Sequence, residues 1–229
     1  MHARPPFDAT AARRLREALG MTPAHVAYGM FAAYGVRVSP ATVAAWEQHE
    51  EAPTEDEIAA LAGALWCAPS DLLGTPRTLR EHRMAAGVPL PDVAIKVGIP
   101  VAQYEEVERT GKWTGNDRQA AVLADLLRLP ARTHLELTGR DARLREMLRS
   151  AASVRWQAYV RPVCKLLPTA PQENVERVLE RLNDEFHKRS FASLSWIDTS
   201  SEAANGSVDA GHRYLADVVE HFWELLEQL

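Results

Sequence analysis

The sequence predicts an all-α protein, on the basis of three observations. Residues that start and stop helices divide the first 74 positions into short segments. In the later segments, apolar residues recur at the spacing of one helix face. The order of the first segments then occurs a second time along the chain, which indicates a duplicated helical unit.

Capping residues mark the short helices expected in residues 8–74. A proline at the first helical position has no N–H to leave unpaired, and a capping box satisfies two N–H groups at once. The SDLLG stretch that follows predicts a short terminal turn ending at Gly74. The predicted signals are Asp8 and Gly20 for the first helix, Thr22 and Pro23 for the second, Ser39 and Pro40 for the third, and Thr54 with Glu57 for the fourth.

Residues 76–139 repeat this plan. LREALGMTPAHVA, which ends at Ala27, parallels HRMAAGVPLPDVA, which ends at Ala94, and LAGAL parallels LADLL. From that alanine to the next matching acid, Glu47 or Glu108, the first unit spans 20 positions and the second spans 14. The six extra residues lie around YGMFAAYG, and we expect them to lengthen the second helix or its turn.

From Arg140 onward the pattern changes to longer amphipathic helices. RDARLREMLRSAASVRWQAYV is expected to run until Pro162 kinks or ends it, and QENVERVLERLNDEFHKRS forms another helix. A Ser/Gly-rich loop separates these from a final helix, whose broad apolar stripe needs a partner surface inside the domain or on another chain. A dimer interface is predicted at Leu215, Val218, Val219, Phe222 and Leu226. The predicted domains are therefore residues 1–75, 76–139 and 140–229.

The charge of the chain excludes a protein that binds nucleic acid through its overall field. The net charge is −5, with 14 Lys and Arg against 17 Asp and Glu in residues 1–139, and 12 against 14 in the remainder. Any DNA binding must therefore be local. Cys67 and Cys164 are far apart and form no metal-binding spacing, so a reducing cytoplasm is the expected location.

The longest segment without Asp, Glu, Lys or Arg runs from Ala18 to Val36 and raises the question of a membrane span. It contains three glycines, Thr22, Pro23 and His25, which argue against one. The amino terminus, MHARPPFD, lacks the apolar core of a signal peptide.

No pattern in the sequence points to catalysis or to a cofactor. The eight histidines have no metal-ligand spacing, and there is no nucleophile elbow, Walker loop or dinucleotide fingerprint. We therefore expect a protein that is not an enzyme and holds no metal. Aromatic residues of the carboxyl-terminal region could line an effector pocket, although ordinary core packing is the commoner role: Trp156, Tyr159, Trp196, Tyr214, Phe222 and Trp223.

Residues 8–74 resemble the lambda-repressor-like, Xre/Cro-type helix-turn-helix family, through LREALG, the VA dipeptide, SPATVAAWE and LAGALWCAPSDLLG. Residues 76–139 resemble the same family more weakly, through HRMAAG, DVA, YEEVERTGKW and LADLL. Residues 140–229 resemble no family. The resemblance implies two tandem helix-turn-helix domains followed by a helical carboxyl-terminal domain that forms a homodimer and could bind a small-molecule or protein effector.

The resemblance also implies residue roles. An arginine of the first helix pairs with the glutamate that closes the recognition helix, which gives Arg16 with Glu47 and Arg83 with Glu108 as structural pairs. The recognition helix lies in the DNA major groove with its amino-terminal residues toward the bases. The residues expected at DNA are Arg37, Ser39, Pro40, Ala41, Thr42, Ala44, Ala45, Gln48 and His49 in the first unit, Gln103, Arg109 and Lys112 in the second, and Arg4 at the amino terminus.

Two functions are compatible with this pattern. The first is a sequence-specific, DNA-binding transcriptional regulator that acts as a homodimer on two half-sites. The second is an interaction module, such as an adaptor, antitoxin or anti-regulator, whose helix-turn-helix units no longer bind DNA. The recognition helix of the first unit offers bases only two hydroxyls and several methyl groups, and the second unit places Glu105 on the corresponding face, with Glu106 next to it. The Ala- and Arg-rich composition is typical of high-GC bacteria.

Overall fold

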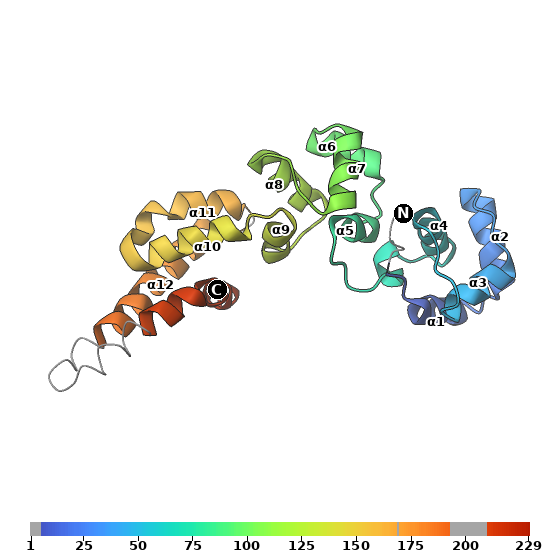
Figure 1. The fold of residues 1–229 in the computed structure, drawn as a ribbon. Coiled ribbons are helices and arrows are strands. Elements are labelled where there is room, and N and C mark those ends of the chain that lie inside the picture. Colours follow the sequence, from blue (N-terminus) through green and yellow to red (C-terminus); the bar gives the residue numbers. More distant parts are fainter. Residues whose placement is uncertain (1–5, 169, 193–209) are drawn as a thin grey trace. The chain divides into compact units, whose positions relative to one another are not determined.

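The computed structural model describes residues 6–168, 170–192 and 210–229 (Figure 1). All the secondary-structure elements in these residues are helices, so the predicted all-α class is confirmed. None of the described helices combines the length and apolar character needed to cross a membrane. Arg4, Trp196 and the Ser-rich stretch of residues 193–201 lie outside the described residues.

The chain divides into two compact units, residues 1–129 and residues 130–229. The sequence placed this boundary after residue 139 instead. The difference is helix α9 (Ala131–Leu137), whose Leu135 side chain is buried in the hydrophobic core of the second unit. That burial assigns α9 to the carboxyl-terminal unit.

The first helical group of the amino-terminal unit consists of α1 (Ala9–Ala18), α2 (Pro23–Tyr34), α3 (Pro40–Glu47), α4 (Glu55–Ala64) and the 3-10 helix η1 (Pro69–Leu72). All four predicted caps are confirmed. The side chains of Asp8, Thr22 and Ser39 each accept a hydrogen bond from the backbone of the following helix, and Thr54 and Glu57 cap each other reciprocally. These bonds satisfy N–H groups that a helix start leaves unpaired, so each helix begins at a defined residue.

The second helical group consists of α5 (Leu79–Ala85), α6 (Leu90–Val97), α7 (Val101–Thr110) and α8 (Asp117–Leu126). Residues at matching positions of the two groups are buried in the same way. The buried pairs are Val26 and Val93, Val43 and Tyr104, Trp46 and Val107, and Leu61 and Leu123. The sequence repeat therefore corresponds to a repeated pattern of packing.

The six extra residues of the first group lengthen both elements that the sequence proposed. Helix α2 has 12 residues and α6 has 8, so four of the six extend the helix. The connection to the next helix is residues 35–39 in the first group and 98–100 in the second, so the other two extend the turn.

The carboxyl-terminal unit continues with α10 (Asp141–Ser150), a π-helical turn η2 (Ala151–Arg155), a 3-10 turn η3 (Trp156–Ala158), α11 (Val160–Leu166), α12 (Gln172–Ala192), a helical segment at residues 210–216 and α14 (Val218–Glu227). The break in the first long helix comes before Pro162 and not at it. Pro162 lies in the first turn of α11, where a backbone N–H would have no acceptor within the helix, so the N–H that proline lacks is not missed.

The final helix packs into its own unit. Val218 and Phe222 are fully buried in a core shared with α10 and α12, so a second chain cannot reach these two residues of the predicted dimer interface. Leu215, Val219 and Leu226 are partly buried against the same core. The apolar stripe that suggested dimerisation is explained by partners inside the unit.

Candidate functional site

Helix α3 has one side in the core and one side in solvent. Val43 and Trp46 are buried, which fixes the rotation of the helix. Most of the predicted DNA-contacting residues of the first unit are consequently exposed, and Thr42, Ala44 and Ala45 are half-buried at the edge. We call this side the α3 surface, formed by Arg37, Ser39, Pro40, Ala41, Thr42, Ala44, Ala45, Gln48 and His49.

The two hydroxyl groups of the α3 surface are bonded to each other. Ser39 Oγ lies 2.8 Å from Thr42 Oγ1, and the Thr42 backbone N–H also donates to Ser39 Oγ at 3.0 Å. One hydroxyl must donate its proton to the other, so only one of the two protons stays available to an outside acceptor. This helix therefore has fewer free hydrogen-bond donors for the bases than the sequence suggested.

Arg37 is the exposed cation nearest in sequence to the amino-terminal end of α3. Its guanidinium carbon lies 5.0 Å from the centre of the Phe31 ring, a cation–π contact between the end of α2 and the turn. This contact holds the charge beside the first residues of α3. At the other end of the helix, Glu50 and Glu51 are exposed and would repel phosphate groups.

The predicted pair of Arg16 and Glu47 is present and ties α1 to the end of α3. Arg16 donates from Nε to Glu47 Oε1 at 2.6 Å and from Nη2 to Glu47 Oε2 at 2.7 Å, a bidentate contact with both side chains mostly buried. A third donor, Nη1, bonds the carbonyl of Met21 at 2.7 Å. The hydrogen bond to Glu47 raises the pKa of Arg16, and it outweighs the partial loss of hydration.

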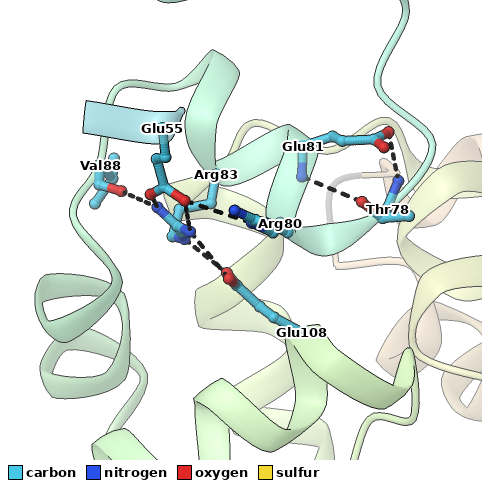
Figure 2. Close-up of polar contacts among 7 residues, drawn as sticks. All are labelled: Glu55, Thr78, Arg80, Glu81, Arg83, Val88 and Glu108. Carbon is cyan, nitrogen blue, oxygen red and sulfur yellow. Dashed lines mark hydrogen bonds and ion pairs between the residues drawn. The ribbon is translucent and has the colours of Figure 1, made fainter. Parts of the chain in front are cut away.

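The matching pair in the second group has an additional partner (Figure 2). Arg83 donates to Glu108 from Nε at 2.6 Å and from Nη2 at 2.9 Å, and its Nη1 bonds the carbonyl of Val88 at 3.2 Å. Glu55, at the start of α4, accepts from both Nη1 and Nη2 of the same guanidinium. Arg83 therefore joins the first helical group to the second.

Both arginines reach a backbone carbonyl five residues further along the chain, at Met21 and at Val88. The repeat thus extends to individual hydrogen bonds. Glu55 is the element that sequence reasoning missed, because its position in the first turn of α4 is also where acids are generally favoured by the helix dipole. Nothing in its spacing pointed to Arg83.

The charges of this cluster shift the pKa values of Arg83 and Glu55. Burial alone would lower the pKa of Arg83, but the hydrogen bonds to Glu108 and Glu55 raise it well above its ordinary value. Partial burial raises the pKa of Glu55, but the bond and charge of Arg83, together with Arg80 at 3.4 Å, lower it overall. Arg83 and Glu55 are therefore both charged over the physiological pH range.

Two of the three predicted contacts of the second unit are already engaged. Gln103 donates from its amide to Thr114 Oγ1 at 2.8 Å, and Arg109 donates from Nε to Glu106 at 2.7 Å. A phosphate would have to displace the Glu106 carboxylate from Arg109. Glu105 is exposed on the same helix, and Lys112 is the one predicted contact of this unit that is exposed and has no described side-chain partner. The side of α7 that carries Gln103, Glu105, Glu106 and Arg109, here called the α7 surface, is thus poorer than the α3 surface as a site for a polyanion.

The proposed aromatic effector pocket is mostly core. Tyr214, Phe222 and Trp223 are buried, and Trp156 and Tyr159 pack against the same cluster. A cleft of about 110 Å³ beside α9 and α14 is lined by Arg132, Glu220 and Trp223 among others. Pockets for drug-sized ligands are generally about 300–1,000 Å³, so this cleft could take only a small group.

Comparison of the chain with protein-family models, with curated proteins and with solved structures finds no match in any of the three.

Proposed function

We propose that this protein is a sequence-specific, DNA-binding transcriptional regulator. It is built from two tandem helix-turn-helix units of the lambda-repressor-like, Xre/Cro type and acts as a homodimer. Helix α3 of each chain enters a major groove, and the second unit supports the first. The observation that carries the proposal is the presentation of α3: the Arg16–Glu47 pair fixes one side of it while Ser39, Ala41 and Gln48 stay exposed.

In this function, DNA is recognised chiefly by shape and by methyl contacts. Ala41, Ala44 and Ala45 present methyl groups that fit the C5-methyl of thymine, and one hydroxyl proton of the Ser39–Thr42 pair can donate to a base edge. Arg37 supplies a phosphate contact beside these residues. Such a limited set of contacts needs two chains on two half-sites to reach a useful affinity.

The acidic α7 surface favours a second candidate function. Glu105, together with Glu106 held against Arg109, suits a protein partner better than a nucleic acid. The chain would then be an adaptor, antitoxin or anti-regulator that retains the helix-turn-helix fold without binding DNA.

Selection from a pool of genomic DNA fragments separates the two functions. The purified chain is mixed with the pool at a series of salt concentrations, and bound fragments are sequenced. A regulator enriches a discrete site, and its affinity falls as salt rises because bound counterions are released from the phosphates. Absence of enrichment at every salt concentration would overturn the proposal and leave the interaction module.

A further inference from the structure

The carboxyl-terminal region has an uneven distribution of charge along its sequence. Residues 140–165 contain seven Lys and Arg against two Asp and Glu, whereas residues 166–229 contain five against twelve. The near-balance of 12 against 14 over the whole region therefore conceals one segment of net charge +5 and one of −7. A protein of negative net charge that binds a polyanion needs a local positive segment of this kind.

The second part of the positive segment contains no acids. Between Glu146 and Glu173 the chain has 26 consecutive residues without Asp or Glu. The cations within them are Arg149, Arg155, Arg161 and Lys165. The one other acid-free stretch of at least this length is residues 18–46, which hold most of the α3 surface.

Three of these four cations are available to an outside partner. Arg155, Arg161 and Lys165 are exposed, and no hydrogen bond or ion pair of their side chains is described. Arg149 differs, because its Nε donates to the carbonyl of Leu215 at 3.2 Å. We call Arg155, Arg161 and Lys165 the basic face.

The packing of α11 fixes the direction of two of these side chains. Val160, Val163 and Leu166 are buried in the core of the unit. Consecutive residues of a helix point about 100° apart, so Arg161 and Lys165 lie on the side of α11 opposite to this core. They are four residues apart and are therefore neighbours on that side.

Arg155 lies at the corner between η2 and α11. Its backbone, with φ of −143° and ψ of 96°, leaves the helical conformation at the end of the π-helical turn. Asn183 holds the start of that turn through the carbonyls of Ala151 and Ala152. Helical turns of this type are frequent at functional sites. From Arg155 to Arg161 the rise along the helical turns is roughly 10 Å, a length over which a DNA duplex presents several phosphates.

One carboxylate lies beside α11, on a different side from the basic face. Burial and the charge of Glu176 raise the pKa of Cys164, which places Glu176 near that thiol. Cys164 points about 100° away from Lys165 on the helix. Glu176 accepts a hydrogen bond from Gln172 at 2.8 Å and makes no described ion pair with the basic face. The basic face therefore keeps its charge for a partner outside the unit.

We propose that the basic face binds the phosphate backbone of double-stranded DNA. The inference rests on the proposed function and adds a contact outside both helix-turn-helix units. Exposed cations bind phosphates without regard to base sequence, and such contacts supply much of the affinity of DNA-binding proteins. The α3 surface has few base contacts and one arginine, Arg37, so the chain needs phosphate contacts elsewhere.

The charge of the basic face would also attract an anionic membrane, but its surroundings favour DNA. A helix that lies on a membrane inserts an apolar face beside its cations. The apolar residues Val163 and Leu166 of α11 are buried in the core of the unit. This helix therefore has no free apolar side to insert.

Fluorescence anisotropy with a random-sequence DNA duplex of about 30 base pairs, titrated with the full chain at about 50 to 200 mM salt, tests the proposal. The triple variant Arg155→Gln, Arg161→Gln, Lys165→Gln is expected to bind at least tenfold more weakly than wild type at the lowest salt. The slope of log affinity against log salt should become shallower by about 2.7, because each lost phosphate contact accounts for about 0.9.

Two further variants separate local charge from net charge and from folding. The matched control is Arg177→Gln, Arg181→Gln, Lys188→Gln, which removes three exposed cations of α12 with the same change in net charge. It should bind within about twofold of wild type. Arg155→Lys with Arg161→Lys keeps the charges of the basic face and should also bind like wild type.

Three results would overturn the proposal. They are a wild-type chain that does not bind the duplex at about 50 mM salt, equal losses in the two triple variants, and a basic-face variant that binds DNA like wild type but loses affinity for phosphatidylserine vesicles. The random duplex contains no selected site. Failure of the proposed function, seen as absence of enrichment from genomic fragments, is therefore distinct from failure of the basic face.

Discussion

At the residue scale, the amino-terminal unit depends on two arginines with similar surroundings, Arg83 buried and Arg16 mostly buried. Arg83 pairs with carboxylates from two different helical groups, whereas the carboxylates that Arg16 pairs with, Glu47 and Glu17, both belong to its own group. Removing one partner of a buried pair is costly because the charge left behind has lost both its partner and its water. The largest effects on stability are therefore expected at these few side chains.

Arg83→Ala is expected to reduce the free energy of unfolding by about 3–5 kcal/mol, because Glu108 stays buried without a counter-charge. Urea denaturation followed by circular dichroism measures the change. Arg109→Ala is the control, since it removes an arginine whose ion pair is on the surface of the same unit. A loss below about 1 kcal/mol for Arg83→Ala would show that the pair behaves like a surface contact.

Acid should weaken the link between the helical groups through Glu55. The lowered pKa of Glu55 means that its ion pair stabilises the fold fully above the ordinary carboxyl range, and that this contribution disappears as the pH falls through the lowered value. Glu55→Gln is therefore expected to lower the free energy of unfolding at about pH 7 and to have little effect at about pH 3.

Urea denaturation at both pH values measures this difference. Asp56→Asn, one position along in the same turn, controls for the loss of charge near the start of α4. An effect of Glu55→Gln that is equal at both pH values would contradict the assigned role of the carboxylate.

At this scale, the sequence predicted ion pairs within a helical group but did not predict the ion pair between the two groups. The Arg16–Glu47 and Arg83–Glu108 pairs were predicted from the resemblance to a helix-turn-helix family, and the repeat places the two pairs at matching positions. Glu55 has no such signal, because its partner belongs to the other helical group and only the packed structure brings them together.

At the element scale, the sequence predicted helix starts better than helix breaks. The caps of α1 to α4 are local hydrogen bonds between residues three apart, so sequence spacing predicts them. The break at residues 151–158 depends on a distant residue instead. Asn183 of α12 donates from its amide to the carbonyls of Ala151 at 3.2 Å and Ala152 at 2.8 Å, at the start of the π-helical turn.

Asn183→Leu is expected to reduce the free energy of unfolding by about 1–3 kcal/mol, because two carbonyls of η2 lose a donor that a leucine cannot replace. Urea denaturation measures it, with Lys188→Leu on the exposed side of the same helix as the control. An unchanged stability would mean that η2 holds its conformation without Asn183.

At the scale of the whole molecule, the repeat could be predicted but the partner of an apolar face could not. The spacing of the stripe in α14 is the same whether its partner lies within the unit or on another chain, and burial of Val218 and Phe222 decides for the former. Conversely, the sequence alone raised only the question of a membrane span for the charge-free segment that contains α2. The structure shows that the aromatic residues of this helix are exposed.

The central claim is that α3, and not α7, is the helix that reads DNA. Ala41 and Ala102 are both exposed and both lie at the second position of their helices, where an acid is tolerated well. The most direct measurement is the affinity of Ala41→Glu and Ala102→Glu for the selected DNA site at one fixed salt concentration. The account predicts at least a tenfold loss for Ala41→Glu and a change within about twofold for Ala102→Glu. Wild-type affinity for Ala41→Glu, or an equal loss in both variants, would contradict it.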